Sequence, residues 1–530
     1  MDVAVRRRPS GWTVAGIAVA AAVLAPLLVL PASFLGQGEA LDQIAGSLLP
    51  EALRASLVLA AGVGVGTLLL GGSLAALVSF YDFPGRRWLD WALVLPLAMP
   101  AYVLVYVLLG QYDGSGPFGG RLPEIRSTGG TIAVLTAVLY PYVYVLARGA
   151  FLGQSRQALE AARTLGLSYG AAVRRVALPL ARPALAGGVA LAVMEALADF
   201  GAVNLLNYRA LTDAIYRVWY GTFDQAAALQ LATVLVTLAA TLVALEHFAR
   251  GRARYHQALG RGEAVLPRRL RGPVAWLAPA LPALLLLAAV VAPIAQLLAW
   301  AIGSLGEGAS AEALARAAVN SLLLASVAAV VAVIAATVVA YAPRAQPSRL
   351  AGGFGRASAL GYAVPGTVVA VAVYVPLAWL DARLDDLAGV GLLLTGTAVG
   401  LVLAYVVRFH ALALFSVQGR MARISPSLDE AARSLGADRS RLLADVHLPL
   451  LWPGIAIAAL LVFVEVVKEL PATALLRPLG GDTLAIAVWE ATKDSRFDTA
   501  ALPALMIVAV GLVPVVLAIR LSRVGGFDGG

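Results

Sequence analysis

The heptapeptide EAARTLG occupies residues 160–166, and a nearly identical heptapeptide, EAARSLG, occupies residues 430–436. The two copies lie 270 positions apart, and the same spacing relates Pro179 to Pro449. A sequence that repeats at a constant spacing is built from copies of one structural unit. The chain is therefore predicted to consist of two similar halves, each with one of these heptapeptides.

The repeat extends beyond the heptapeptides and defines the predicted domains. Ser56 matches Ser321 at a spacing of 265, so the second half gains about five residues before its heptapeptide. The predicted first half covers residues 1–250, a basic linker covers 251–272, and the second half covers 273–530. Six predicted spans separate the copies, so both run the same way through the membrane, as parallel repeats about an axis along the membrane normal.

The composition is that of a chain dissolved in lipid. Of 530 residues, 60% are hydrophobic and only 13% are charged, and mean hydropathy is +0.83. Soluble domains are about 25% charged. There is no cysteine, which excludes disulfides and cysteine metal sites. We expect an all-α integral membrane protein with about twelve spans. The expected spans are 12–35, 53–80, 89–110, 130–150, 183–206, 225–247, 273–302, 317–342, 357–380, 391–414, 453–476 and 499–520.

The distribution of arginine predicts how the chain is oriented. Alternate loops are rich in arginine, whereas the loops between them are acidic or mixed. Arginine and lysine concentrate in cytoplasmic loops, so this alternation places both termini in the cytoplasm. Membrane topology also accounts for the net charge of +9 without a nucleic-acid partner.

Each half has one long loop on the predicted cytoplasmic side, at residues 151–182 and 415–452. Each loop reads Glu-Ala-Ala, three residues, glycine, a basic stretch and then Leu-Pro. We interpret this as a short helix, a left-handed break at Gly166 or Gly436, and a second short helix. The Ser-x-x-Glu sequence at 427–430 fits a capping box in which its serine begins the helix. Such a polar elbow suits docking onto a cytoplasmic partner.

These loops resemble the Glu-Ala-Ala coupling loops of ABC-importer permeases, in which the short helix fits a groove on an ATPase subunit. The resemblance implies a binding-protein-dependent transport permease of the bacterial inner membrane, with two copies of a separate ATPase subunit that hold ATP and magnesium. This chain has no Gly-Lys-Ser/Thr phosphate loop of its own and is not expected to be an enzyme. The positions that match are Glu160, Ala161, Ala162, Gly166, Leu178, Pro179, Glu430, Ala431, Ala432, Gly436, Leu448 and Pro449.

Two predicted spans carry charges: Glu195 and Asp199 in the first half, and Glu465, Lys468 and Glu469 in the second. Carboxylates four residues apart would share one helix face. A charge at mid-membrane costs about 2.5–3.5 kcal/mol, so these groups are expected to face the substrate pathway. Carboxylate oxygens suit a hard cation, and the four carboxylates are a candidate transient metal site. Gating or helix packing, and ion-pair bracing such as Lys468 with Glu465, are the alternatives.

Three further stretches point to a substrate. Residues 140–148, 198–201 and 468–478 resemble the signatures of ferric-iron-type permeases, and this resemblance covers nearly the whole chain. It implies that a periplasmic binding protein delivers Fe(III), which then crosses by alternating access. Thiamine, putrescine or an anion are alternative substrates in the same class, although buried carboxylates argue against anions. A secondary transporter is the rival class, and a membrane enzyme would need a catalytic constellation that the sequence lacks.

Overall fold

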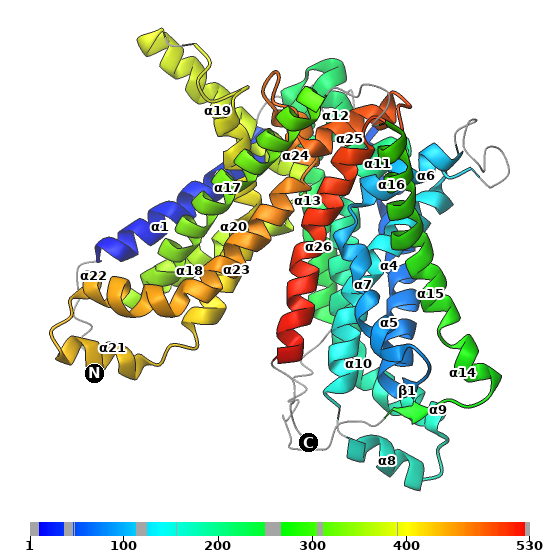
Figure 1. The fold of residues 1–530 in the computed structure, drawn as a ribbon. Helices are drawn as coiled ribbons and strands as arrows, with labels where there is room; N and C mark the ends of the chain where they lie inside the picture. Colours follow the sequence, from blue (N-terminus) through cyan, green and yellow to red (C-terminus); the bar gives the residue numbers. More distant parts are fainter. Residues whose placement is uncertain are drawn as a thin grey trace. The chain divides into compact units, whose positions relative to one another are not determined.

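A computed structural model describes residues 10–35, 46, 48–112, 124–154, 156–249, 267–304, 311–389 and 391–524 (Figure 1). Most of the predicted linker, residues 250–266, lies outside this part of the chain. The described part is helical apart from loops and one pair of two-residue strands, β1 Tyr81–Asp82 and β2 Arg268–Arg269, which are parallel. The all-α prediction is therefore confirmed.

The helices form two compact units that exchange segments of the sequence. The first-half unit contains Ile44–Ala214, Val234–Ala311 and Ala487–Gly530, and the second-half unit contains Met1–Gln43, Ile215–Thr233 and Glu312–Ile486. The predicted boundary at residues 251–272 therefore separates the sequence repeats but does not coincide with the borders of the compact units.

The first-half unit contains most of the helices of the first repeat, together with the first and last spans of the second. Its helices are α4 Leu48–Phe80, α5 Arg86–Ala92, α6 Ala101–Tyr112, α7 Thr128–Leu152, α8 Arg156–Thr164, α9 Tyr169–Ala172, α10 Leu178–Ala198, α11 Gly201–Leu205, α14 Pro273–Leu277, α15 Ala280–Leu286, α16 Ala292–Ser304 and α26 Ala501–Val524. Short 3₁₀ or π turns are η3 Leu95–Ala98, η4 Val173–Ala177 and η6 Leu287–Val291.

The second-half unit has the corresponding composition, with the first span of the chain added to the second repeat. Its helices are α1 Gly11–Leu24, α2 Val29–Ala32, α17 Ala311–Ala345, α18 Arg349–Ser358, α19 Gly366–Ala388, α20 Ala398–Met421, α21 Pro426–Ser434, α22 Arg439–Arg441, α23 Leu448–Val467 and α24 Pro471–Leu476. Its short turns are η1 Ala25–Leu28, η2 Ser33–Leu35, η5 Val218–Thr222, η7 Ala359–Ala363 and η8 Leu442–His447. The borders of the units fall within α12 Leu211–Arg217, α13 Gln225–Ala249 and α25 Leu484–Lys493.

The long apolar helices of the described residues agree with the prediction of about twelve membrane spans. Among the described residues, ten helices are long and apolar enough to span a membrane. The span predicted at 89–110 is a pair of helices bent by 88° between Ala98 and Ala101, and it makes an eleventh crossing if counted as one. The last predicted span matches α26, which has 24 residues.

Helices α4, α7 and α10 pack closely in the first-half unit, and glycine makes this possible (Figure 1). A Cβ atom on Gly62 of α4 would lie 2.4 Å from Ile132 of α7, and one on Gly66 would lie 2.5 Å from Thr136. Small residues let membrane helices approach one another to this distance. The glycines of α4 are therefore packing residues and not part of a phosphate-binding loop.

The first span of the chain packs against the second repeat. The backbone N–H of Ser10 donates a hydrogen bond of 2.6 Å to Gln346, and the rings of Trp12 and Tyr341 meet edge to face at 5.1 Å. A Cβ on Gly16 would collide with that of Ala342, at 2.4 Å. The helix pairing is thus specific, and it ties the N-terminal helix of one repeat to the other repeat.

The first span of the second repeat packs on the first-half unit in the same manner. The hydroxyl of Tyr106 on α6 donates to the carbonyl of Phe497, and its ring lies 5.5 Å from that of Trp300 on α16. Gly110 leaves room for the rings of Trp300 and Phe497. Each repeat therefore contributes its first span to the unit built mainly from the other.

Candidate functional site: two coupling loops and the broken spans

The two Glu-Ala-Ala loops have the same backbone geometry. Helix α8 of the first loop ends at Thr164, two residues before Gly166, whose φ is +89°. Helix α21 of the second loop ends at Ser434, two residues before Gly436, whose φ is +85°. In the first loop the N–H of Leu167 bonds to the carbonyl of Ala162 at 3.2 Å, and that of Gly166 to Arg163 at 3.0 Å. This pair of bonds is the Schellman motif, which satisfies carbonyls at a helix end. The predicted left-handed break is confirmed.

The second loop repeats this hydrogen-bond pattern 270 residues later. The N–H of Ala437 bonds to Ala432 at 3.0 Å, and that of Gly436 bonds to Arg433 at 3.0 Å. A short second helix follows each glycine, α9 in the first loop and α22 in the second. The predicted order of short helix, glycine and short helix is therefore confirmed in both copies. The loops are shorter than predicted, because α7 continues to Leu152 and α20 to Met421.

Each short helix has a buried face and an exposed face. In α8, Leu159 and Ala162 are buried, whereas Glu160 and Ala161 are exposed. In α21, Asp429 is buried and Ala432 is half-buried, whereas Glu430 and Ala431 are exposed. The glutamate of each Glu-Ala-Ala motif thus lies on the face turned away from the rest of its unit.

A leucine at each glycine break is almost fully exposed. Leu165 has a relative exposure of 85% and Leu435, its counterpart 270 residues later, of 88%. A single exposed leucine would need no explanation. Here both copies place a leucine at the same tip, beside the exposed glutamate face, which indicates a surface that a partner covers.

The predicted start of α21 is wrong by two residues. Ser425 is the N-cap, and its hydroxyl accepts a hydrogen bond of 3.3 Å from the N–H of Ser427, the residue that the capping-box reading had placed at the cap. Pro426 occupies the first helical position. Proline favours that position because its missing N–H is not needed there. The helix therefore starts earlier than predicted and still includes Glu430.

Both loops enter the following span through a π turn. The N–H of Leu178 bonds to the carbonyl of Val173, and that of Leu448 bonds to Leu443, both five residues back. Pro179 and Pro449 follow at once, and neither has an N–H for the usual α-helical bond. The wider turn carries the helix past the proline. The Leu-Pro pair therefore marks the join between elbow and span, as predicted.

A buried charge cluster anchors the second loop. Arg344 at the end of α17 donates two hydrogen bonds of 2.8 Å to Asp429 of α21, and Nε2 of His447 lies 3.0 Å from the same carboxylate. Burial raises the pKa of Asp429, but the hydrogen bonds from Arg344 and His447 outweigh this effect and hold that pKa below its ordinary value. The sequence analysis missed this cluster, because its members are 18 and 85 residues apart along the chain.

The first loop has no such cluster at the equivalent positions. Leu159 stands where the second loop has Asp429, and Ala177 stands where it has His447. Ser79, at the upstream spacing of 265, corresponds to Arg344. Leu159 is 3% exposed and Ala177 is fully buried, and both belong to an apolar core with Tyr144 and Phe151. Apolar packing thus fixes the first loop, and ionic hydrogen bonds fix the second.

The spans predicted at 183–206 and 453–476 are broken near their carboxylates. Helix α10 ends at Ala198, and Asp199 has φ −69° and ψ 126°, which is extended backbone. Helix α23 ends at Val467, before Glu469. The prediction that the two carboxylates of each span share one helix face is therefore wrong, because the second of each pair lies beyond the helix end.

Asp199 and Glu469 instead begin the next short helices. Asp199 accepts hydrogen bonds from the N–H groups of Ala202 at 2.9 Å and Val203 at 3.3 Å, at the start of α11. Glu469 accepts from the N–H groups of Ala472 at 2.9 Å and Thr473 at 3.0 Å, at the start of α24. Each carboxylate thus satisfies backbone donors that a helix N-terminus leaves unpaired.

The second-half carboxylates also form ion pairs. Arg408 of α20 donates a hydrogen bond of 2.9 Å to Glu469, whose side chain is only 1% exposed. Lys468 lies 2.8 Å from Glu465, and these two side chains are 25% and 32% exposed. Bracing, which the sequence analysis kept as an alternative, therefore describes the contacts of Glu469 and Lys468. Glu195 is half-buried on α10.

The proposed metal site is divided between the units. Glu195 and Asp199 lie in the first-half unit, and Glu465 and Glu469 lie in the second-half unit. Within the described residues, no group of three or more histidine or carboxylate side chains is close enough to hold a metal ion. The four carboxylates stay a prediction as transient ligands, and capping is the observed role of Asp199 and Glu469.

Comparison with known proteins identifies the family. A family described as the binding-protein-dependent transport system inner membrane component matches residues 67–246 and 328–524, one match in each half. The chain belongs to this family. It is therefore a transport subunit, a multi-pass inner-membrane permease of the ABC-importer class, and both repeats carry the family's signature.

Individual relatives differ in how much of the chain they match. The chain is 27% identical over 518 residues to an Fe(3+)-transport system permease of Haemophilus influenzae, covering 96% of this chain and 98% of the relative. It is 37% identical over 183 residues to a probable molybdenum permease of Haloferax volcanii, which covers 33% of this chain. A sulfate permease of Escherichia coli is 38% identical over 145 residues, or 26% of this chain. Only the first of these three shares the fused two-half layout.

Proposed function

We propose that this permease imports ferric iron, delivered by a periplasmic binding protein, and that two copies of an ATPase subunit drive it. The observation that carries the substrate assignment is the similarity to an Fe(3+)-transport permease along almost the whole length of both chains. The matches to molybdenum and sulfate permeases are confined to parts of the chain. The carboxylates of the two broken spans, of which Glu469 is buried and the other three are half-buried, also favour a cation over an oxyanion.

The two ATPase copies are inferred from the pair of loops. Each loop presents an exposed glutamate and an exposed leucine, Glu160 with Leu165 and Glu430 with Leu435. A mixed polar and apolar face of this kind fits a groove on a partner protein. In the mechanism that we propose, ATP draws the two ATPases and their loops together, the permease opens outward to the loaded binding protein, and hydrolysis resets it. Both termini are proposed to lie in the cytoplasm, on the side of these loops.

Coupling is tested with charge reversal at the exposed face. Glu160→Lys and Glu430→Lys should each abolish uptake and lower ATP hydrolysis by the assembled complex at least tenfold. Each substitution reverses the charge that the short helix presents to the groove on the ATPase subunit. Glu124→Lys, on the loop at the other end of the membrane, is the matched charge control. Unchanged uptake in well-assembled Glu160→Lys and Glu430→Lys complexes would contradict the assignment of these loops.

The substrate is tested by reconstituting permease, ATPase and binding protein in proteoliposomes. ATP hydrolysis is measured with the binding protein iron-free, loaded with Fe(III), or offered thiamine, putrescine, sulfate or molybdate. Stimulation by the Fe(III)-loaded protein alone supports iron import. Stimulation by another solute keeps the permease assignment and removes iron. Glu195→Ala and Glu465→Ala should reduce iron-dependent stimulation if these carboxylates line the pathway, and equal stimulation in both variants would leave them a structural role only.

A further inference from the structure

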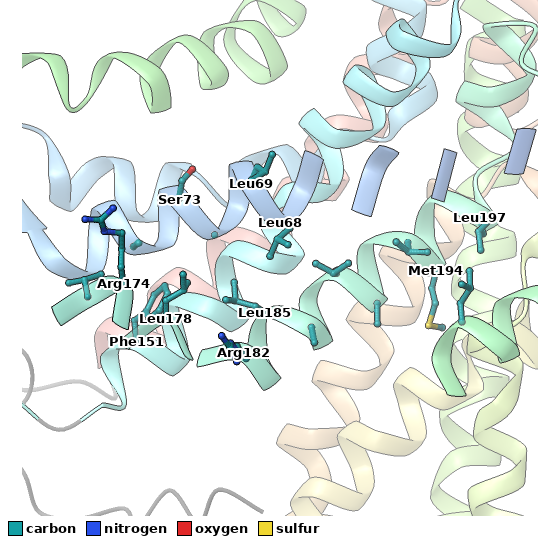
Figure 2. Close-up of a pocket in the computed structure, with 18 of the residues that line it drawn as sticks. Leu68, Leu69, Ser73, Phe151, Arg174, Leu178, Arg182, Leu185, Met194 and Leu197 are labelled. Carbon is teal, nitrogen blue, oxygen red and sulfur yellow. The ribbon is translucent and has the colours of Figure 1, made fainter. Parts of the chain in front are cut away.

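The first-half unit contains a long apolar groove that the transport assignment does not use. The groove has a volume of about 840 Å³ and runs along α10, between α4 and the part of α13 near Ala239 (Figure 2). Apart from Ser73 and two arginines, all of its lining side chains are apolar or glycine. Glu195 is not among them, so the groove follows a different face of α10 from this candidate pathway residue.

Both arginines lie at one end of the groove, the end that carries the first Glu-Ala-Ala loop. Figure 2 shows Arg174 and Arg182 near Phe151 and Leu178, with Met194 and Leu197 at the opposite end. Arg174 and Arg182 are both exposed. No ion pair joins either guanidinium to a carboxylate of a described residue. One end of an apolar groove therefore carries two positive charges that no described acidic side chain neutralises.

The groove is long enough to hold a lipid tail. Arg182 and Leu197 are fifteen residues apart on one helix, which corresponds to about 22 Å at 1.5 Å per residue. Half of a membrane's hydrocarbon core is about 15 Å thick. An acyl chain could thus lie along the apolar part while its phosphate meets the arginines. Guanidinium groups are well suited to phosphate, because they donate two hydrogen bonds in a fixed fork.

The second half lacks the charged end. At the spacing of 270, Ala444 stands in place of Arg174 and Trp452 in place of Arg182. Trp452 is 66% exposed. The two arginines are therefore not a requirement of the coupling-loop fold, since the second loop reaches the same backbone geometry without them.

From these observations we propose that the groove on α4, α10 and α13 binds one anionic phospholipid, with its phosphate held by Arg174 and Arg182 and an acyl chain along α10. Basic pockets beside membrane helices attract anionic headgroups, and each arginine near the headgroup contributes roughly a factor of five in affinity. The site does not depend on the identity of the transported substrate, so its test needs neither the ATPase nor the binding protein.

The test is native mass spectrometry of the full-length permease in detergent, titrated with phosphatidylglycerol or phosphatidylcholine. We expect one phosphatidylglycerol to bind more tightly than phosphatidylcholine, and the double variant Arg174→Ala/Arg182→Ala to lose about 25-fold in affinity for it. Arg175→Ala is the matched control, because Arg175 is exposed and adjacent but does not line the groove. This control should keep the affinity within about twofold, because a guanidinium that does not line the groove lacks the contribution assigned to each arginine of the site.

A second pair of variants tests the apolar part. Ala190→Trp fills the groove without changing its charge and should abolish the tight site, whereas Leu191→Trp, on the neighbouring face of α10, should not. Equal affinity for the two lipids would overturn the proposal, as would equal losses in Arg175→Ala and the double variant. Retention of the tight phosphatidylglycerol by Ala190→Trp would show that the charges act without the groove and would also overturn it.

Discussion

Leu159 in the first Glu-Ala-Ala loop and Asp429 in the second occupy the same position in the repeat, on the buried face of the same short helix. One packs into an apolar core, and the other accepts hydrogen bonds from Arg344 and His447. Both loops nevertheless keep the same left-handed glycine and the same Schellman bonds. The comparison teaches that local sequence sets the shape of the elbow, whereas its attachment to the membrane helices can use either kind of contact.

The largest loss of stability is expected when the apolar residue that holds the first loop replaces the carboxylate that holds the second. Asp429→Leu places the first-loop residue in the second loop and leaves Arg344 and His447 without their carboxylate. We expect a loss of about 3 kcal/mol in unfolding free energy, the lower end of the range for a broken buried pair, because Arg344 keeps 18% exposure. The measurement is equilibrium unfolding in mixed detergent micelles.

The control for this experiment converts the whole anchor. The triple variant Arg344→Ser/Asp429→Leu/His447→Ala carries the residues of the first loop at all three positions. Replacing a complete ionic cluster with apolar groups is often close to neutral, so most of the lost stability should return. A triple variant as unstable as Asp429→Leu would show that the two anchors are not interchangeable.

A second comparison concerns the helix breaks. Glu469 is paired with Arg408. At the corresponding positions, 270 residues earlier, the first half has Asp199 in place of the glutamate and Val138 in place of the arginine. Arg408→Val should cost about 2 kcal/mol, because it removes a hydrogen bond to a buried charged group. The double variant Arg408→Val/Glu469→Asp restores the first-half pair and should recover part of this loss. The measurement is the unfolding free energy of the single and the double variant under the same conditions. If the double variant is no more stable than Arg408→Val, the arginine is required for more than charge balance.

The glycine breaks should respond equally in the two loops. Gly166→Ala and Gly436→Ala force a side chain into left-handed backbone, at a cost of about 1 kcal/mol each, with no steric clash to add to it. Gly149→Ala and Gly419→Ala are matched controls, also 270 apart, in helices α7 and α20 with open space around them. These controls should be neutral or slightly stabilising. Unequal effects of the first two substitutions would contradict the shared geometry.

The smallest effect is a difference in acid sensitivity. The pKa of Asp429 in the folded protein lies below its ordinary value of 3.8, so its stabilising effect is present above that pH and is lost as pH falls through the lowered pKa. The wild-type permease should therefore lose more thermal stability between pH 5 and pH 3 than the triple variant, which has no carboxylate at this position. Melting curves in detergent at both pH values measure this, and parallel acid losses would remove Asp429 as a contributor.

The sequence by itself determined the membrane class, the repeat, the two elbows and their glycine breaks. It could do so because hydrophobic length, constant spacing and the conformational freedom of glycine are local properties of the chain. It also located Glu195, Asp199, Glu465 and Glu469, but it treated each span as one continuous helix. The breaks at Ala198 and Val467 depend on which backbone donors each carboxylate meets, and spacing alone does not reveal that.

Only the tertiary structure decided how the repeats exchange their first spans and what anchors each loop. Arg344 and Asp429 are 85 residues apart, and Ser10 and Gln346 are 336 apart, so their pairing depends on packing between distant helices. The same holds for the lipid groove, whose walls come from α4, α10 and α13. A repeat in sequence specifies two similar backbones, but the side chains that fill the space between helices are chosen separately in each half. That is why near-identical heptapeptides rest on an apolar core in one copy and on a charge cluster in the other.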